Sequence, residues 1–127
     1  MVRKKGFYIL ILVLTAAVMS ATAFAAGNVG FYDVAESAWY ADAVEYVNEN
    51  GIMSGISNDR FFPDSPMTRG MLATVLYRMA GSPAVYGTDD FSDTEEGAWY
   101  SDGVVWASQG GLISGYGSGR FGTNDPV

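Results

Sequence analysis

Apolar side chains recur at helical spacing between residues 40 and 47. The first such group occupies positions i, i+3, i+4 and i+7 and consists of Tyr40, Ala43, Val44 and Val47. Side chains at these positions share one face of a helix, so the pattern predicts a helix of about three turns. Ser37 is a suitable N-cap because its hydroxyl can accept from a free amide, and Gly51 is the expected left-handed stop.

The same pattern returns 60 residues later, with Gly111 as the stop. Its apolar positions are Tyr100, Gly103, Val104 and Ala107. Gly103 stands where the first helix has Ala43, so we expect this later helix to be less stable by about 1 kcal/mol. A further helix is predicted between Thr68, its N-cap, and Gly81, its stop. The expected buried face of that helix consists of Met71, Leu72, Val75, Leu76 and Met79.

The chain repeats itself with a period of 60 residues. Residues 31–67 align with residues 91–127, and 14 of the 37 aligned positions are identical. Repeats indicate a modular unit, and this period is longer than that of most solenoid repeats. The first copy continues beyond the aligned part, whereas the second stops there. We therefore expect a complete first unit over residues 26–81, a polar linker over 82–90, and a truncated second unit over 91–127.

Each unit is predicted to consist of a helix, a turn-rich loop and a second helix, which makes the fold all-α. The loops are rich in glycine, asparagine and aspartate, which supply the left-handed conformations that tight turns need. The truncated unit lacks its second helix, so Val104 and Ala107 are expected to have no partner within the unit. This unit should be the least stable part of the chain, and its exposed apolar face is expected to allow self-association.

The first 25 residues have the features of a secretory signal peptide. The basic residues Arg3, Lys4 and Lys5 precede an apolar run over residues 7–18, and the Ala-Phe-Ala sequence of residues 23–25 follows. A small-x-small sequence is the pattern that signal peptidase cleaves. The apolar run is shorter than the ~20 residues needed to cross a bilayer. We expect cleavage after Ala25, secretion, and no transmembrane span in the mature chain.

The residue types in the chain exclude several classes of function. The chain has no Cys and no His, which removes thiolate zinc sites, cysteine nucleophiles and the commonest general base. The net charge is −7, and removal of residues 1–25 leaves 14 acidic and 4 basic residues, a net charge of −10. Such a charge argues against nucleic acid, whose phosphates need a basic face. No cofactor and no metal site are expected.

An acidic cluster lies around the end of the linker and consists of Asp89, Asp90, Asp93, Glu95 and Glu96. It lacks the spaced order of acidic residues and glycine that an EF-hand calcium loop requires. A solvated acidic segment is therefore the favoured interpretation. Asp33 and its repeat counterpart Asp93 are expected to cap turns.

Five short fragments occur in a fixed order in the first copy: Phe31-x-Asp33-Val34, Trp39-Tyr40-x-Asp42-Ala43-Val44, Gly51-Ile52-x-x-Gly55, Phe61-x-Pro63-Asp64 and Met67-Thr68-Arg69. They return in part in the second copy. In this order and spacing the chain resembles the S-layer homology (SLH) domain. The resemblance implies helix–loop–helix units that usually occur in threes and bind secondary polysaccharides attached to bacterial peptidoglycan. Such units hold proteins on the bacterial cell wall and cell surface.

The resemblance also implies ligand-binding residues. In the family the arginine of the Thr-Arg motif, here Thr68-Arg69, faces a groove between units and meets an acidic, often pyruvylated sugar. A guanidinium pairs with a carboxylate through two parallel hydrogen bonds, and free amides at a helix N-terminus would favour the same anion. Trp39 would suit the apolar face of a sugar ring. Gly55, in the loop, would let backbone amides approach the ligand closely.

Several positions depart from the family pattern. Where the family has Thr-Arg-Ala-Glu, this chain has Thr-Arg-Gly-Met at residues 68–71, so no glutamate closes a capping box and the helix start should be looser. Thr123 stands where the first copy has Pro63. Trp39 and Trp99 lie beside tyrosines at helix starts, so core packing is favoured over sugar stacking for both.

Three classes of function remain. A non-catalytic carbohydrate-binding module that anchors a protein to the cell wall is favoured. An enzyme such as a glycosidase with two carboxylates is disfavoured, because the carboxylates lie mostly on loops and the repeated module leaves no separate catalytic domain. A calcium-dependent protein-interaction module of the dockerin type would need calcium loops that are missing from both copies. A further alternative is that the chain is the anchoring fragment of a larger exoenzyme.

Overall fold

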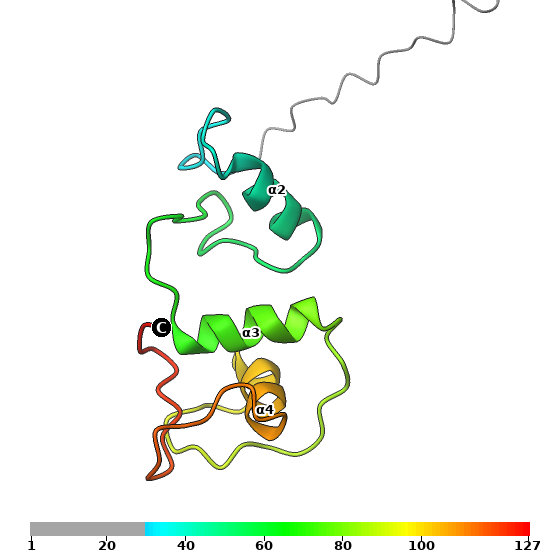
Figure 1. Ribbon diagram of the computed structural model, residues 1–127, viewed down its shortest axis with the longest axis vertical. Coiled ribbons are helices and arrows are strands. Elements are labelled where there is room, and N and C mark those ends of the chain that lie inside the picture. The colour runs from blue at the N-terminus through cyan, green and yellow to red at the C-terminus, as the bar shows by residue number, and fades with distance from the viewer. Residues whose placement is uncertain (1–29) are drawn as a thin grey trace, which may run out of the picture.

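A computed structural model describes residues 30–127, which contain three helices: α2 (Ala41–Glu49), α3 (Arg69–Met79) and α4 (Ser101–Gln109) (Figure 1). Within this range β-structure is limited to isolated bridges, so the regular elements of the described residues are helices, as the all-α prediction requires. The helices of residues 30–127 are too short or too polar to cross a bilayer. The predicted signal peptide, residues 1–25, lies outside the described part of the chain.

The predicted helix ends are correct in all but one case. The Thr68 side chain accepts a hydrogen bond from the Met71 amide, so Thr68 is the N-cap of α3. Gly51 and Gly111 have φ values of +66° and +69°, which is the left-handed conformation expected after α2 and α4. The predicted cap at Ser37 is wrong. The segment before α2 forms successive backbone turns instead, and the helix begins after Tyr40 without a side-chain cap.

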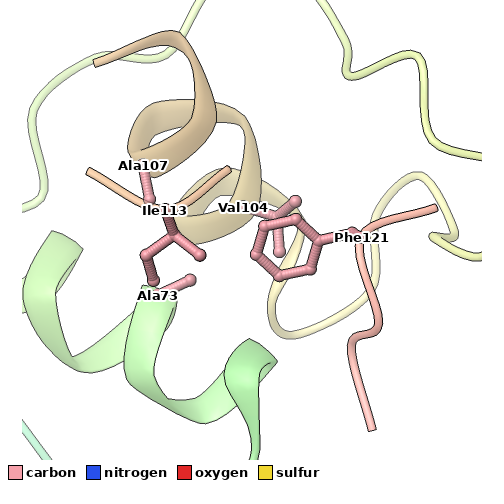
Figure 2. Close-up of a cluster of buried hydrophobic side chains, with 5 residues drawn as sticks. All are labelled: Ala73, Val104, Ala107, Ile113 and Phe121. Carbon is pink, nitrogen blue, oxygen red and sulfur yellow. The ribbon is translucent and has the colours of Figure 1, made fainter. Parts of the chain in front are cut away.

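Two hydrophobic clusters form the interior of residues 30–127. The first belongs to α2 and its flanking segments and consists of Phe31, Val34, Ala41 and Val44, against which Phe61 packs. The second joins α3, α4 and the loop that follows α4, and consists of Ala73, Val104, Ala107, Ile113 and Phe121 (Figure 2). In Figure 2 the Ala73 side chain points from α3 toward Val104 and Ile113. Each repeat therefore carries a core, but only the second core includes residues from α3.

The helix α3 packs against α4 and not against α2, which precedes it in the chain (Figure 1). The two helices approach closely because small residues lie at their contact. A Cβ on Gly103 of α4 would lie only 2.8 Å from the Cα of Thr74 in α3. The predicted buried face of α3 is therefore partly wrong: Gly70, Ala73 and Thr74 are its buried residues, whereas Met79 is 64% exposed.

The second unit has the partner that it was expected to lack. Val104 and Ala107 are fully buried, because α3 covers the apolar face of α4. The expected exposed apolar face is thus absent from this part of the chain, and with it the basis for self-association through that face. The propensity cost expected at Gly103 stays a prediction, and the structure adds a reason for the glycine, since it allows the two helices to approach closely.

Two aspartates connect the start of each unit to its loop. The Oδ1 and Oδ2 atoms of Asp33 accept hydrogen bonds from the amides of Phe61 and Phe62, at 2.9 and 2.7 Å. Asp93 accepts from the two equivalent amides of the second loop, both at 2.8 Å. These side chains therefore do not cap local turns, as was expected, but join segments far apart in the sequence. Desolvation raises the pKa of both carboxyls, but the amide hydrogen bonds outweigh it, and each pKa lies below its ordinary value.

Candidate functional site

A hollow of about 520 Å³ lies between the first loop and α3, and we call it the inter-unit hollow. The first loop (residues 52–67) supplies one wall, with mostly apolar side chains. The helix α3 supplies the other wall through Met71, Val75 and Arg78, and Trp99 reaches it from the segment before α4. The hollow thus combines residues of both units, and its lining is of the apolar kind that binds small ligands.

A smaller hollow of about 280 Å³ adjoins it on the side of α4. Three residues, Thr74, Arg78 and Trp99, line both hollows. The smaller hollow is richer in polar groups, which include the side chains of Tyr77, Ser82, Ser101 and Asp102. Arg78 and Trp99 therefore lie between an apolar hollow and a polar hollow.

Arg78 lies in the last turn of α3, where a cation interacts favourably with the helix dipole. Its Nη1 atom donates a hydrogen bond to the carbonyl oxygen of Ile52, at 3.2 Å. This contact fixes the half-buried guanidinium against the first loop. A guanidinium has several N–H donors, and the contacts described within residues 30–127 use one of them.

Both tryptophans beside the helix starts are exposed, so the expectation of core packing is wrong for both. Trp39 is 93% exposed and Trp99 is 59% exposed. Each indole lies edge-on to the following tyrosine, with ring centroids 5.5 Å apart at Trp39 and Tyr40 and 5.2 Å apart at Trp99 and Tyr100. Tyr40 and Tyr100 pack against the hydrophobic clusters, and the indoles beside them stay exposed to solvent. Trp99 lines the two hollows, and Trp39 lines neither.

Arg69 contacts the second loop (residues 112–127). Its Nε atom donates to the Phe121 carbonyl at 2.9 Å, and its Nη2 atom donates to the Ser114 carbonyl at 2.5 Å. The guanidinium also lies over the ring of Tyr116, 4.5 Å from the ring centroid. The arginine that the motif predicts as a ligand contact is therefore bound to the protein's own backbone.

The amides at the start of α3 are bound as well. The amide of Arg69 donates to Asp125 O and that of Gly70 to Thr123 O, both at 2.9 Å, and Thr68 caps the next amide. The C-terminal segment continues alongside the cap, where the Val127 amide donates to Met67 O at 3.0 Å. The expectation that free amides here would favour an anion is therefore wrong.

Gly55 is the one predicted site residue that lines the inter-unit hollow. Its φ is +74°, and a Cβ at this position would lie 2.6 Å from the Arg60 carbonyl oxygen. The structure thus does not bring the four predicted residues together: Thr68 and Arg69 lie at the start of α3, and Trp39 lies on the surface beside α2.

Sequence reasoning did not single out Arg78, and it favoured core packing over sugar stacking for Trp99. Trp99 could have been found as the repeat counterpart of Trp39. For Arg78 the only signal was its rarity, as one of the few cations after residue 25. Together they offer an aromatic surface and a guanidinium at one site, a pair that suits a sugar bearing a carboxylate.

The sequence profile described as S-layer homology domain matches residues 30–70 and 90–127. A cell surface protein of Thermoanaerobacter kivui is 31% identical over 107 residues, which cover 80% of this chain and 14% of that protein. A cellulosome-anchoring protein of Acetivibrio thermocellus is 31% identical over 93 residues, which cover 70% of this chain and 21% of that protein. An endo-1,4-beta-xylanase A of Thermoanaerobacterium saccharolyticum is 26% identical over 86 residues, which cover 68% of this chain and 7% of that enzyme. The chain thus spans about a fifth or less of these relatives.

Proposed function

Because this chain belongs to the S-layer homology domain family, we propose that it binds a secondary polysaccharide attached to peptidoglycan. Domains of this family are anchoring modules of the bacterial cell surface. The family does not by itself specify the polymer, so the proposal depends on the chemistry of the site.

The observation that carries the proposal is the position of Arg78 and Trp99 between the two hollows. The exposed Trp99 indole would stack on the apolar face of a sugar ring. The Arg78 guanidinium, fixed by Ile52 O, would pair with a carboxylate on that sugar, such as that of a pyruvyl group. Hydroxyl and carboxylate side chains of the smaller hollow would bond the sugar hydroxyls.

The charge of the chain makes a local cationic group necessary for this ligand. Residues 30–127 contain 14 acidic and 4 basic side chains, so the surface as a whole repels an acidic polymer. A carboxylate would be bound only where a guanidinium is held in position and partly shielded from water. Arg78 meets that condition, because it is half-buried and borders both hollows.

The residues predicted from the sequence have supporting roles in this proposal. Thr68 and Arg69 keep α3 against the second loop and so hold Arg78 in place. Gly55 shapes the wall of the inter-unit hollow. Trp39 would be a second, separate surface for a sugar, since it is exposed but borders neither hollow.

The proposed role is binding without catalysis, as part of a larger surface protein or exoenzyme. This agrees with relatives named as a cellulosome-anchoring protein and as a xylanase, in which the matched region is a small share of the whole. The chain would supply attachment, and the remaining parts of such a protein would supply its other activities.

Cosedimentation with purified bacterial cell-wall sacculi tests the proposal. Arg78→Ala is expected to weaken binding by about tenfold or more, because a charge-assisted pair is lost. Arg78→Lys should also weaken it, since lysine cannot form the two-pronged pair, and Trp99→Ala should do so through lost stacking. Arg120→Ala is the control, because it removes the same charge from an exposed side chain that lies outside both hollows and whose ion pair is a 3.9 Å contact with Asp93. Equal binding by the parent, Arg78→Ala and Trp99→Ala would contradict the proposal.

A further inference from the structure

Phe62, in the first loop, has a backbone conformation that its side chain disfavours. Its φ is +61°, in the left-handed region where a bulky residue is an outlier. Two hydrogen bonds hold it there: Asp33 Oδ2 accepts from the Phe62 amide at 2.7 Å, and the Ser65 amide donates to Phe62 O at 3.1 Å. Strain of this kind persists only where the surrounding structure fixes it, and it concentrates at functional sites.

The second loop has a glycine at the equivalent position. Gly122 has a φ of +76°, and its amide donates to Asp93 as the Phe62 amide does to Asp33. The loop backbone thus takes the left-handed conformation at this position in both units. Glycine adopts it without steric cost, whereas the first unit carries an aromatic side chain there despite the cost.

The residues around this position also differ between the units, and they are larger where the position is glycine. A Cβ on Gly122 would collide with the Tyr116 ring and would lie 2.7 Å from Asp125 Oδ2. The counterparts of Tyr116 and Asp125 in the first loop are the smaller residues Ile56 and Ser65. The first loop therefore has room for the side chain that the second loop excludes.

That side chain lies at the inter-unit hollow. Phe62, Ile56 and Ser65 all line it, and Phe62 is 40% exposed. The Arg60 guanidinium lies 5.9 Å from the centroid of the Phe62 ring. Core packing does not account for the position, because Phe62 belongs to neither hydrophobic cluster, whereas the neighbouring Phe61 packs against the first one. The exposed ring contributes surface to the hollow.

We propose that Phe62 is a ligand-contacting residue and that the inter-unit hollow holds one pyranose ring, with an apolar face on Phe62 and a second aromatic contact from Trp99. The inference rests on the proposed function, because it assigns a further contact within the same site. The two aromatic side chains come from different units, so the hollow binds the pyranose ring only while the two units stay packed together. An aromatic side chain packs well on the C–H groups of a pyranose face, because that face is uncharged and has few hydrogen-bond donors.

Phe62→Gly and Phe62→Tyr test the proposal in the sacculus cosedimentation assay, with Arg78→Ala run beside them. Glycine keeps the left-handed backbone without strain but removes the ring, so binding is expected to weaken by about tenfold. Tyrosine keeps the ring, so binding should stay within about twofold of the parent. Far-UV circular dichroism should give the parent's helical signal for both variants.

Two outcomes would overturn this inference while leaving the proposed function intact. The first is parent-like binding by Phe62→Gly when Arg78→Ala has lost binding. The second is an equal loss in Phe62→Gly and Phe62→Tyr, because the position would then act through loop geometry and not through its ring. If the parent itself does not bind sacculi, the proposed function falls and the Phe62 contact falls with it.

Discussion

Gly70 in α3 and Gly103 in α4 lie where another segment of backbone passes within contact distance. A Cβ on Gly70 would lie 2.7 Å from the Thr123 side chain, and one on Gly103 would lie 3.0 Å or less from three backbone atoms of Ala73 and Thr74. Two departures from the family motif and from the first repeat, Gly70 and Thr123, are therefore neighbours in space. The close contact at each position leaves no room for a Cβ, although glycine lowers the stability of the helix itself.

Replacement of Gly103 by alanine tests this interpretation, because packing and propensity predict opposite signs. Alanine favours the helix by about 1 kcal/mol, but its Cβ would force α3 and α4 apart. We expect Gly103→Ala to lower the free energy of unfolding by about 1–3 kcal/mol, measured by urea unfolding. Ala43→Gly at the exposed counterpart in α2 is the control, and should lower it by about 0.5–1 kcal/mol. A more stable Gly103→Ala variant would refute the close contact.

The carboxylates of Asp33 and Asp93 make stability depend on pH in a defined direction. Their pKa values are lowered in the folded chain, so their contribution is present above the unfolded pKa of about 3.9 and is lost as pH falls through the folded value. We expect Asp93→Asn to be less stable than the parent at pH 7, because one amide loses its carboxylate acceptor. The difference should shrink as the pH is lowered from about 4 through the lower folded pKa of Asp93, where the parent's carboxylate becomes protonated. Urea midpoints across this range measure it, and a difference independent of pH would contradict the role of the charge.

At the scale of elements, α3 is held at its start by side-chain and backbone contacts with the second loop. Arg69 contributes two hydrogen bonds to carbonyl oxygens and lies over an aromatic ring, while Thr68 forms the cap. A helix held in this way places Arg78, about two and a half turns later, against the first loop. Arg69 is thus a positioning residue for the proposed site.

Arg69→Ala is therefore expected to affect folding as well as binding. The loss of two charge-assisted hydrogen bonds should lower the free energy of unfolding by about 1.5–3 kcal/mol. Arg78→Ala, which loses one contact to a carbonyl, should cost about 1 kcal/mol or less. Urea unfolding of both variants gives the comparison. Equal stability of Arg69→Ala and the parent, together with lost binding, would instead support direct ligand contact by Arg69.

The sequence was sufficient to predict the helices but not how they pair. Periodicity located all three, and Gly51, Gly81 and Gly111 ended them as expected, because these signals are local. The partner of α3 could not be predicted, since an apolar stripe does not specify which helix covers it. The buried residues of α3 are small or polar, as at Ala73 and Thr74, so hydropathy alone does not identify that face.

The candidate site was harder to predict for a related reason. Motif residues such as Arg69 are recognisable one by one, but the inter-unit hollow arises where two units meet. Arg78 comes from the end of α3 and Trp99 from the segment before α4, and no spacing in the sequence connects them. Only the packing of α3 on α4 brings the two side chains together.

At the scale of the whole molecule, the two cores should differ in how they open. The second cluster joins α3, α4 and their loop, whereas α2 contacts neither of the other described helices. In hydrogen exchange we expect the amides of residues 71–80 and 101–110 to open together, and those of α2 to open earlier. The sequence alone predicted instead that the second unit, residues 91–127, would be the least stable part of the chain. Earlier exchange in α4 than in α3 would show that the shared core is not a cooperative unit.

The Val127 amide donates a hydrogen bond to Met67 O, so two residues 60 positions apart are joined beside the start of α3. The segment joined in this way begins at Met67, whereas the copies of the 60-residue repeat begin at residues 31 and 91. A genetic crossover within residues 82–90 would separate α3 from the helix that it covers, whereas a crossover just before Met67 would transfer both together. Recombination among genes that encode such repeats should therefore yield stable proteins more often when the junction falls ahead of the Met67-Thr68-Arg69 segment. The breakpoints that survive selection would then follow the contacts of α3 and not the visible limits of the repeat.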